Sequence, residues 1–356
     1  MKRKERFLKA LNCEIPDRVP IFENLFSPKL QEKIIGYKTD LYDGEAIIKL
    51  AGKLGVDGTT IPIGGFCGFE DFKTDGENFT DEWGVTYIKK GWPIMIQTKN
   101  PIKSRKDWKK YTLPDPKAPH RYTRIKEAIS ANKEDTAIVA NVLGPVTMIY
   151  WYLMDIQTFS IMLFEDSNLI IEICESYKDW VVAVAKDIGK IKGVDAFIIS
   201  DDWGSSNSLL ISPKHLRKYF MKPFRDIVQA IRELGFLVIM HNDGNLWDVL
   251  DELVETGING YHPVERAATM DLKIIKERYK GKLCPIGNVN NKTVMVSGTV
   301  DDVRNETIAC LKEGGPGGGY IISTDHSLHD DIPQRNIWAL IKTAKKYGKY
   351  PLKFDS

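Results

Sequence analysis

The chain has 356 residues, of which 43% are hydrophobic and 28% charged, which is the composition of a globular protein with a sizeable core. Lys and Arg number 50 against 48 Asp and Glu, giving a net charge of +2. Such a balanced charge provides no global field for nucleic acid or an anionic membrane, and we expect neither as a partner.

The cysteines and the N-terminus indicate a reducing compartment. The five cysteines are an odd number and include no C-x-x-C pair, and the first ten residues are charged with no apolar segment behind them. The longest apolar runs, such as residues 180–185, fall far short of the ~18 residues that a membrane span needs. We therefore expect free thiols and a cytoplasmic protein without a transmembrane segment.

Short apolar runs alternate with helical patterns from the N-terminus onward. In the first half the predicted helices are 2–11 and 43–54, with Asp43 as N-cap, and the predicted strands are 18–22, 55–63 and 137–143. Residues 64 to about 119 are rich in Gly, Pro and aromatic residues. This segment is too long for a simple connection, and we expect it to be an insertion.

The same alternation continues to the C-terminus. The predicted strands are 196–200, 236–240, 258–263, 283–286 and 320–323. The predicted helices are one through 150–152, then 167–191, 212–235 with a kink or break at Pro223, 246–256, 271–279, 299–312 and 333–347.

Eight strands alternating with helices predict a (β/α)8 barrel. We expect one barrel domain over residues 1–356, with the insertion at about 64–119 between strands two and three lying over the barrel mouth. An open doubly wound sheet is the alternative, but no G-x-G-x-x-G follows a strand to support it.

Polar residues follow three of the predicted strands directly. His241-Asn242-Asp243-Gly244, Asp201-Asp202-Trp203-Gly204 and Thr324-Asp325-His326 all stand at carboxyl ends, where barrels place their active sites. Because strands five and eight are three apart around the ring, their tips should meet over the central pocket.

His241, Asp243 and His326 form a two-histidine, one-carboxylate set that suits zinc or another divalent first-row metal. The His-x-Asp spacing places both side chains on one side of a strand end. The alternatives are that His241 is an acid/base or substrate-binding residue and that Asp243 serves the turn before Gly244. His262, at the end of strand six, is a reserve ligand.

Asp201 and Asp202 are further candidates for catalysis, either as a base or as acceptors for a substrate. Because adjacent residues point to opposite sides, we expect one to act in the site and the other to serve the structure. Other polar or aromatic residues at or near strand ends are candidates for lining the pocket: Glu23, Asn24, Asp57, Asn141, Tyr150, Trp151, Trp203 and Asn288.

Several motifs together resemble the uroporphyrinogen decarboxylase superfamily, whose members use the (β/α)8 barrel. They are D-R-V-P at 17–20, D-E-W-G-V at 81–85, D-D-W-G at 201–204, I-S-P at 211–213 and G-P-G-G-G-Y-I-I at 315–322. The resemblance covers nearly the whole chain.

Two branches of that superfamily differ at the places that carry chemistry. The decarboxylase has an arginine-bearing segment just after its first strand, whereas residues 23–28 here read E-N-L-F-S-P, without the positive charge that a polyanionic porphyrinogen needs. The corrinoid-linked methyltransferases bind zinc through H-x-C-G after strand five and a cysteine after strand eight. Here those positions hold His241, Asp243 and His326.

The resemblance therefore implies a methyltransferase-like enzyme that moves a methyl group to or from a corrinoid, thiol or pterin. Zinc and a corrinoid carried by a partner protein are the implied cofactors. The alternative is a cofactor-free decarboxylase of a tetrapyrrole, with Asp57 and His326 similar in position to its substrate-binding residues. A third interpretation is a tetrapyrrole- or corrinoid-binding protein without catalysis. A homodimer is left open.

Overall fold

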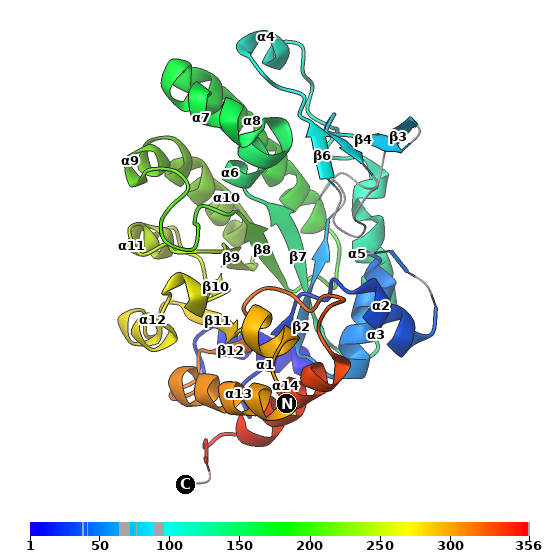
Figure 1. Cartoon of the computed structure of the whole chain (residues 1–356), viewed down its shortest axis with the longest axis vertical. Coiled ribbons are helices and arrows are strands. Elements are labelled where there is room, and N and C mark those ends of the chain that lie inside the picture. Colours follow the sequence, from blue (N-terminus) through cyan, green and yellow to red (C-terminus); the bar gives the residue numbers. More distant parts are fainter. Residues whose placement is uncertain (38, 41, 64–71, 76, 89–95, 355–356) are drawn as a thin grey trace.

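The computed structural model describes residues 1–37, 39–40, 42–63, 72–75, 77–88 and 96–354. Eight parallel strands surrounded by helices form one sheet in the order β1-β2-β7-β8-β9-β10-β11-β12 (Figure 1). The predicted (β/α)8 barrel is confirmed. Its strands are β1 (Phe22–Glu23), β2 (Gly58–Pro62), β7 (Ala137–Leu143), β8 (Ala196–Ser200), β9 (Leu237–His241), β10 (Gly260–His262), β11 (Cys284–Val289) and β12 (Ile321–Thr324).

The two ends of the sheet meet. Ile21 and Ile322 form a parallel bridge, and the N–H of Ile322 donates to the carbonyl of Pro20 at 3.0 Å. Leu25 and Leu328 form a second bridge further along. These contacts join β12 to β1 and nearly close the barrel.

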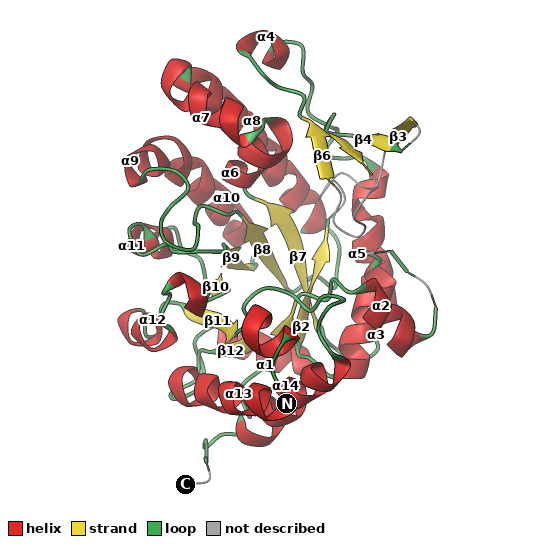
Figure 2. Cartoon of the chain, in the orientation of Figure 1, coloured by secondary structure: helices red, strands yellow, loops and turns green. Residues whose placement is uncertain are grey.

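Figure 2 shows the helices packed around the strands. The longer helices are α1 (Arg3–Leu11), α2 (Pro28–Ile35), α3 (Gly44–Leu54), α5 (Thr123–Ala131), α7 (Ile156–Glu165), α8 (Ser167–Ile188), α10 (Met221–Glu233), α11 (Leu250–Glu255), α12 (Leu272–Arg278), α13 (Val300–Gly314) and α14 (Gln334–Tyr347). Short helices are α4 (Arg105–Trp108), α6 (Pro145–Thr147) and α9 (Pro213–His215). The side chain of Asp43 caps α3 as predicted, accepting from the N–H of Ala46 at 2.8 Å.

One helix prediction needs correction: the helix expected from residue 246 begins only at Leu250. A kink or break is expected at Pro223. The helix from Pro213 runs on to Glu233, and its regular α-helical pattern is interrupted just before Pro223 by a π-type turn at Leu216–Phe220.

The barrel interior is apolar over most of its height. Helix α1 closes the amino-terminal end, where a Cβ added at Gly58 would lie 2.9 Å from the ring of Phe7 and one at Gly260 would lie 2.8 Å from Leu11. Above this plug lies a layer of fully buried residues: Phe22, Val139, Ile198, Ile239, Ile286 and Ile321. The apolar filling supplies the stable base on which the strand ends are held.

Hydrogen-bonded polar pairs replace this filling at the carboxyl ends of the strands. Thr60 donates to Asn24 at 2.7 Å, and Ser200 donates to Asn141 at 2.9 Å. A third pair, His241 with His262, joins β9 to β10. This polar layer forms the floor beneath the strand tips.

Asp57 lies at the opposite end of the barrel, and its predicted place in the pocket is wrong. It precedes β2, is fully buried, and its carboxylate accepts from the guanidinium groups of Arg6 at 2.8 Å and Arg18 at 2.8 and 2.9 Å. Paired and hydrogen-bonded in this way, Asp57 joins α1 to the first two strands.

The segment between β2 and β7 contains a four-stranded antiparallel sheet, beyond the arrowheads of β2 and β7 in Figure 1. Its strands are β3 (Phe72–Asp75), β4 (Asn78–Asp81), β5 (Thr86–Ile88) and β6 (Ile96–Lys99). Trp83 packs on Trp180 of α8 with ring centroids 4.9 Å apart. Coverage of the mouth by the whole segment stays a prediction, because residues 64–71 and 89–95 lie outside the described part.

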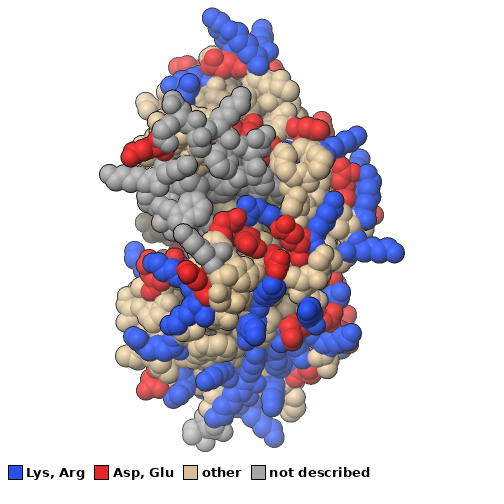
Figure 3. Space-filling view, turned by 90° about the vertical axis from the view of Figure 1, so that its right-hand side faces the viewer, with Lys and Arg blue, Asp and Glu red and all other residues tan. Residues whose placement is uncertain are grey.

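No helix in the described ranges is long and apolar enough to cross a membrane. Acidic and basic side chains are interleaved across the middle of the face in Figure 3, in keeping with the balanced charge. Four cysteines are free, as expected, and Cys67 lies outside the described residues.

Candidate functional site

Two histidines and an aspartate converge where β9 and β12 end. His241 closes β9, Asp243 follows two residues later, and His326 stands two residues beyond β12. One ligand atom from each lies within 4.8 Å of the others. Nε2 of His241 is 3.7 Å from Oδ1 of Asp243, and Nε2 of His326 is 3.4 Å from Oδ2. The structure thus brings together the three side chains that the strand order predicts to meet.

Main-chain contacts hold Asp243 in place. Its N–H donates to Oδ1 of Asp202 at 3.0 Å, and the N–H of Gly244 donates to Oε2 of Glu265 at 2.7 Å. Gly244 has φ +90°, and a Cβ there would lie 2.6 Å from the carbonyl oxygen of Ser205. Helix α11 begins after Val249, and no side chain caps its first turn. Asp243 is therefore not used as a helix cap, and its carboxylate remains available to bind a ligand.

Each histidine is oriented by a partner at Nδ1. Nδ1 of His241 is 2.7 Å from Nδ1 of His262, and Nδ1 of His326 is 2.8 Å from the hydroxyl of Ser327. Both rings therefore turn Nε2 toward Asp243. His262 is not a reserve ligand: it is fully buried beneath His241, and burial lowers its pKa well below the usual value, helped by His241 and His326.

The three groups fit a divalent metal. Ligand atoms ~2.0–2.1 Å from a tetrahedral zinc lie roughly 3.3–3.4 Å from one another. The histidine Nε2 atoms here lie 3.7 and 3.4 Å from the two different oxygens of Asp243, and one ligand atom from each residue lies within 4.8 Å of the others, so the set would contract slightly around the ion. Oδ1 of Asp243 is buried and has no hydrogen-bond partner among the described residues. A buried carboxylate oxygen without a donor needs an explanation, and a bound cation supplies one. Two imidazoles with one carboxylate suit zinc and its first-row neighbours.

A cavity of about 400 Å³ adjoins two of the three groups, Asp243 and His326. It is lined by Gly204, Ser205, Ser206, Asp243, Gly244, Glu265, Ala267, Asn290, Asn291, Lys292, Thr293, Asp325 and His326. Burial raises the pKa of Asp325 to about 7 and that of Glu265 above its usual value. The described lining contains three carboxyl groups, those of Asp243, Glu265 and Asp325, and one lysine, Lys292. Because its pKa is about 7, Asp325 can gain or lose a proton near neutral pH.

The neighbouring aspartates differ as expected from their opposite directions. Asp201 is fully buried and accepts from the N–H of Thr147 at 2.7 Å and the indole of Trp203 at 2.8 Å. Burial raises its pKa to about 7. Asp202 instead holds the main chain of Asp243, and its pKa is raised by burial against the lowering effect of His241. Asp202 belongs to the site, whereas Asp201 supports the loop.

This difference makes a testable prediction. Asp201→Asn places an amide N–H₂ against one of two donors, and we expect the melting temperature to fall because a buried donor left unpaired costs ~1–3 kcal/mol. Asp202→Asn should leave the melting temperature nearly unchanged and weaken metal binding and activity. Thermal unfolding and zinc titration of both variants measure the two effects; equal losses of activity at an unchanged melting temperature would contradict the assignment.

Other predicted pocket residues lie near the site. Asn24 and Asn141 belong to the polar layer beneath it. Tyr150 is buried, and its pKa is raised by burial and by the nearby charges of Asp202 and Asp201. Trp151 is exposed at the surface.

Three further predictions require correction. Trp203 is fully buried and bound to Asp201, so it cannot wall a pocket. Asn288 is fully buried, and its side-chain oxygen accepts from the thiol of Cys310 on α13, which lies outside the barrel wall. Glu23 is fully buried and accepts from the N–H of Thr324 at 3.0 Å and its hydroxyl at 2.8 Å.

Glu265 and Ser327 were not predicted as site residues, and Asp325 was named in the polar tip of strand eight without a role of its own. Asp325 and Ser327 flank His326, and Glu265 follows the sixth strand. The rule that polar residues after barrel strands gather at one face would have included them. Their local sequence shows no pattern such as His-x-Asp to single them out.

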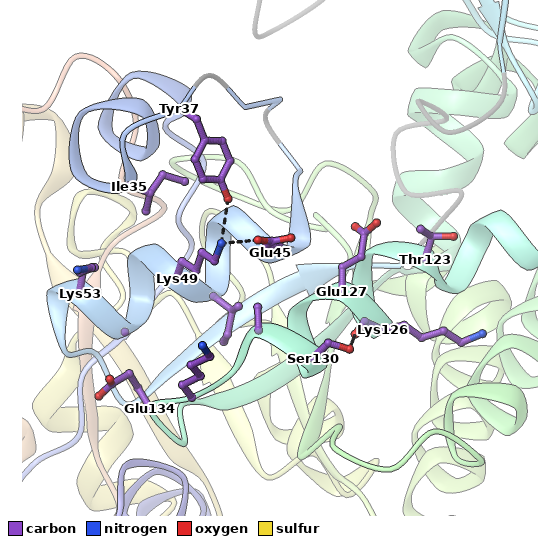
Figure 4. Close-up of a pocket in the computed structure, with 14 residues that line it drawn as sticks. Ile35, Tyr37, Glu45, Lys49, Lys53, Thr123, Lys126, Glu127, Ser130 and Glu134 are labelled. Atoms are coloured by element: carbon purple, nitrogen blue, oxygen red, sulfur yellow. Dashed lines mark hydrogen bonds and ion pairs between the residues drawn. The ribbon is translucent and has the colours of Figure 1, made fainter.

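A larger hollow lies elsewhere, on the outer wall between α3 and α5, with a volume of about 940 Å³ (Figure 4). Its Lys49 is bound to Glu45 and to the hydroxyl of Tyr37. The lining contains no histidine or cysteine. Size alone therefore does not mark the site in this barrel.

Comparison with known proteins places the chain in a family. A family model described as uroporphyrinogen decarboxylase (URO-D) matches residues 84–347, well over half of the chain. The chain belongs to the URO-D family. A methyltransferase from Methanosarcina mazei superimposes on this URO-D protein with a TM-score of 0.74 at 20% identity, covering 98% of this chain and 99% of the other. That likeness shows the shared fold.

Relatives of both branches resemble this URO-D protein. Methylcobamide:CoM methyltransferase MtbA of Methanosarcina acetivorans is 24% identical over 358 residues, covering 97% of this chain and 98% of its own. A uroporphyrinogen decarboxylase of Alkalilimnicola ehrlichii is 21% identical over 360 residues, covering 95% and 93%. At these identities the site, and not the resemblance alone, has to distinguish the activities.

Proposed function

We propose that this URO-D family protein is a methyltransferase that moves a methyl group between a corrinoid and a thiol, with zinc held by His241, Asp243 and His326. The observation that carries the proposal is the convergence of these three side chains at the strand ends. The nearly full-length likeness to methylcobamide:CoM methyltransferases supports it. A corrinoid carried by a partner protein is the methyl donor in this proposal.

In this reaction the side chains of the protein mainly bind and orient the reactants. Zinc, when bound, stabilises the thiolate form of the acceptor near neutral pH. A corrinoid carried by a partner protein would supply the methyl group, and the thiol acceptor would take it up. His241 and His326 supply Nε2, Asp243 supplies the carboxylate that partly neutralises the ion, and Asp325 lines the cavity with a pKa near that needed to take the thiol proton.

A direct assay tests this function. Zinc-loaded protein is mixed with methylcobalamin and each of a set of small thiols, and methyl transfer is followed by the loss of methylcobalamin absorbance. We expect thiol-dependent demethylation that His241→Ala lacks, with Asp331→Ala as an active control because Asp331 is exposed. Demethylation that is equal in His241→Ala and wild type would contradict the proposal.

The decarboxylase alternative has its own test because named decarboxylases are among the relatives. We expect no efficient turnover of uroporphyrinogen III. A substrate bearing several carboxylates would enter a cavity that presents Asp243, Glu265 and Asp325 against Lys292 in the described lining. Coproporphyrinogen formation with kcat in the range of ~1 to 10³ per second would overturn this expectation.

A further inference from the structure

His241 and His262 share one hydrogen bond between identical atoms. Their Nδ1 atoms lie 2.7 Å apart, and the rings stack with centroids 5.0 Å apart at 26°. The two residues are direct partners in the parallel register of β9 and β10. Because two N–H groups cannot face each other at this distance, one Nδ1 carries the proton and the other accepts it.

The surroundings of His262 indicate a neutral imidazole, with a single N–H on its ring. It is fully buried, the edge of the Phe22 ring packs on it with centroids 5.4 Å apart, and no acidic side chain of the described residues forms a hydrogen bond or ion pair with it. A buried imidazole without a countercharge is neutral. Its other nitrogen, Nε2, lies 3.4 Å from the hydroxyl oxygen of Ser323, which has lone pairs to accept.

Two arrangements of that proton have different consequences for His241. With the proton on Nε2, His262 donates to Ser323 and accepts from Nδ1 of His241, so His241 turns a bare Nε2 toward Asp243. With the proton on Nδ1, His241 must carry its own proton on Nε2, where Oδ1 of Asp243 is 3.7 Å away, too far for a hydrogen bond. Both arrangements pair both nitrogens of His262, because the hydroxyl of Ser323 can donate or accept, but only the first leaves Nε2 of His241 bare and ready for a cation.

We propose that His262 is a positioning residue, which accepts the Nδ1–H of His241 and so directs the lone pair of Nε2 of His241 toward Asp243. Protein carboxylates and main-chain carbonyls usually take this role behind a metal-binding histidine. Here a neutral imidazole takes it, so the partner adds no negative charge beneath a site that already holds Asp202 and Asp243. The consequence for metal binding rests on the proposed function, whereas the hydrogen bond itself does not.

Three variants separate this role from general stability. His262→Asn keeps an acceptor near the place of Nδ1, and His262→Leu removes it. Thr60→Val is the matched control: Thr60 is equally buried on the opposite wall, and the change removes one interior hydrogen bond to Asn24. We expect zinc affinity, measured by competition with a chelator, to fall ~10–100-fold in His262→Leu and to recover largely in His262→Asn. Thr60→Val should bind zinc as wild type does.

A second measurement detects the proton directly. The chain has six histidines, so ¹⁵N-histidine labelling gives a tractable spectrum. In metal-free wild type we expect His262 to be protonated on Nε2 and bare on Nδ1. A proton on Nδ1 of His262 would overturn the proposal whether or not zinc binds, and it decides the matter if His262→Leu does not fold.

The remaining outcomes also decide. The positioning role would be overturned if folded His262→Leu bound zinc as tightly as wild type. It would also be overturned if His262→Asn, with a melting temperature equal to that of Thr60→Val, bound zinc as weakly as His262→Leu. Failure of wild type to bind zinc while His262 is protonated on Nε2 would overturn the metal site of the proposed function and leave the hydrogen-bonding role of His262 supported.

Discussion

Asp243→Ala is expected to weaken zinc binding by more than the ~10–100-fold that loss of an outer partner costs, because it removes a ligand. The folded metal-free protein should tolerate the change well. The side chain of Asp243 is 36% exposed, and its Oδ1 has no hydrogen-bond partner among the described residues, so its removal breaks little. Zinc titration and thermal unfolding of the variant measure the two effects.

Asp331→Ala is the matched control for this prediction. Asp331 lies near His329 in the loop after β12, and its side chain is 81% exposed. We expect its zinc affinity to equal that of wild type. Asp243→Ala binding zinc as tightly as this control would remove Asp243 from the metal site.

A second large effect concerns Glu23 and pH. Burial raises the pKa of Glu23 to about 8 from 4.5, although hydrogen bonds from Thr324 oppose the rise. Between these values the folded protein holds a proton that the unfolded chain releases, so the free energy of unfolding falls as pH rises from about 4.5 to about 8. Because each tenfold change in proton affinity is worth ~1.36 kcal/mol, the loss is on the order of several kcal/mol.

Glu23→Gln tests this sign. The amide keeps the shape and an oxygen for the N–H of Thr324, but it cannot ionise. We expect the variant to be more stable than wild type at pH 8 and to show a flatter dependence of stability on pH between 5 and 8, measured by denaturant unfolding. A wild type that gains stability relative to the variant as pH rises through this range would show that Glu23 is ionised in the folded protein.

Strand positions and their ends could be predicted well from the sequence. Strands β7 and β8 have the predicted bounds. A continuous apolar run of this length, bounded by turn residues, is typical of a buried parallel strand. The convergence of His241, Asp243 and His326 followed from strand order alone. Parallel strands bring their carboxyl ends to one face, whatever the loops do.

The direction of a polar side chain at a strand end could not be predicted in the same way. Asn288 and Glu23 stand at strand ends like His241, yet each is buried against residues outside the cavity. The predicted strand 55–63 includes Asp57, but pairing of β2 with β7 begins only at Gly58. Asp57 therefore lies at the amino-terminal end of the barrel, and the sequence alone did not show this boundary. These details depend on register and on partners from distant parts of the chain, such as Cys310 and Arg18.

The most direct test of the metal site is the zinc content of the protein itself. Purified protein is incubated with zinc, freed of unbound metal by gel filtration, and submitted to elemental analysis beside His241→Ala. We predict about one zinc per chain in wild type and almost none in the variant, with the same circular dichroism spectrum for both. Wild type without zinc, or equal zinc in the two proteins, would contradict a metal held by His241, Asp243 and His326.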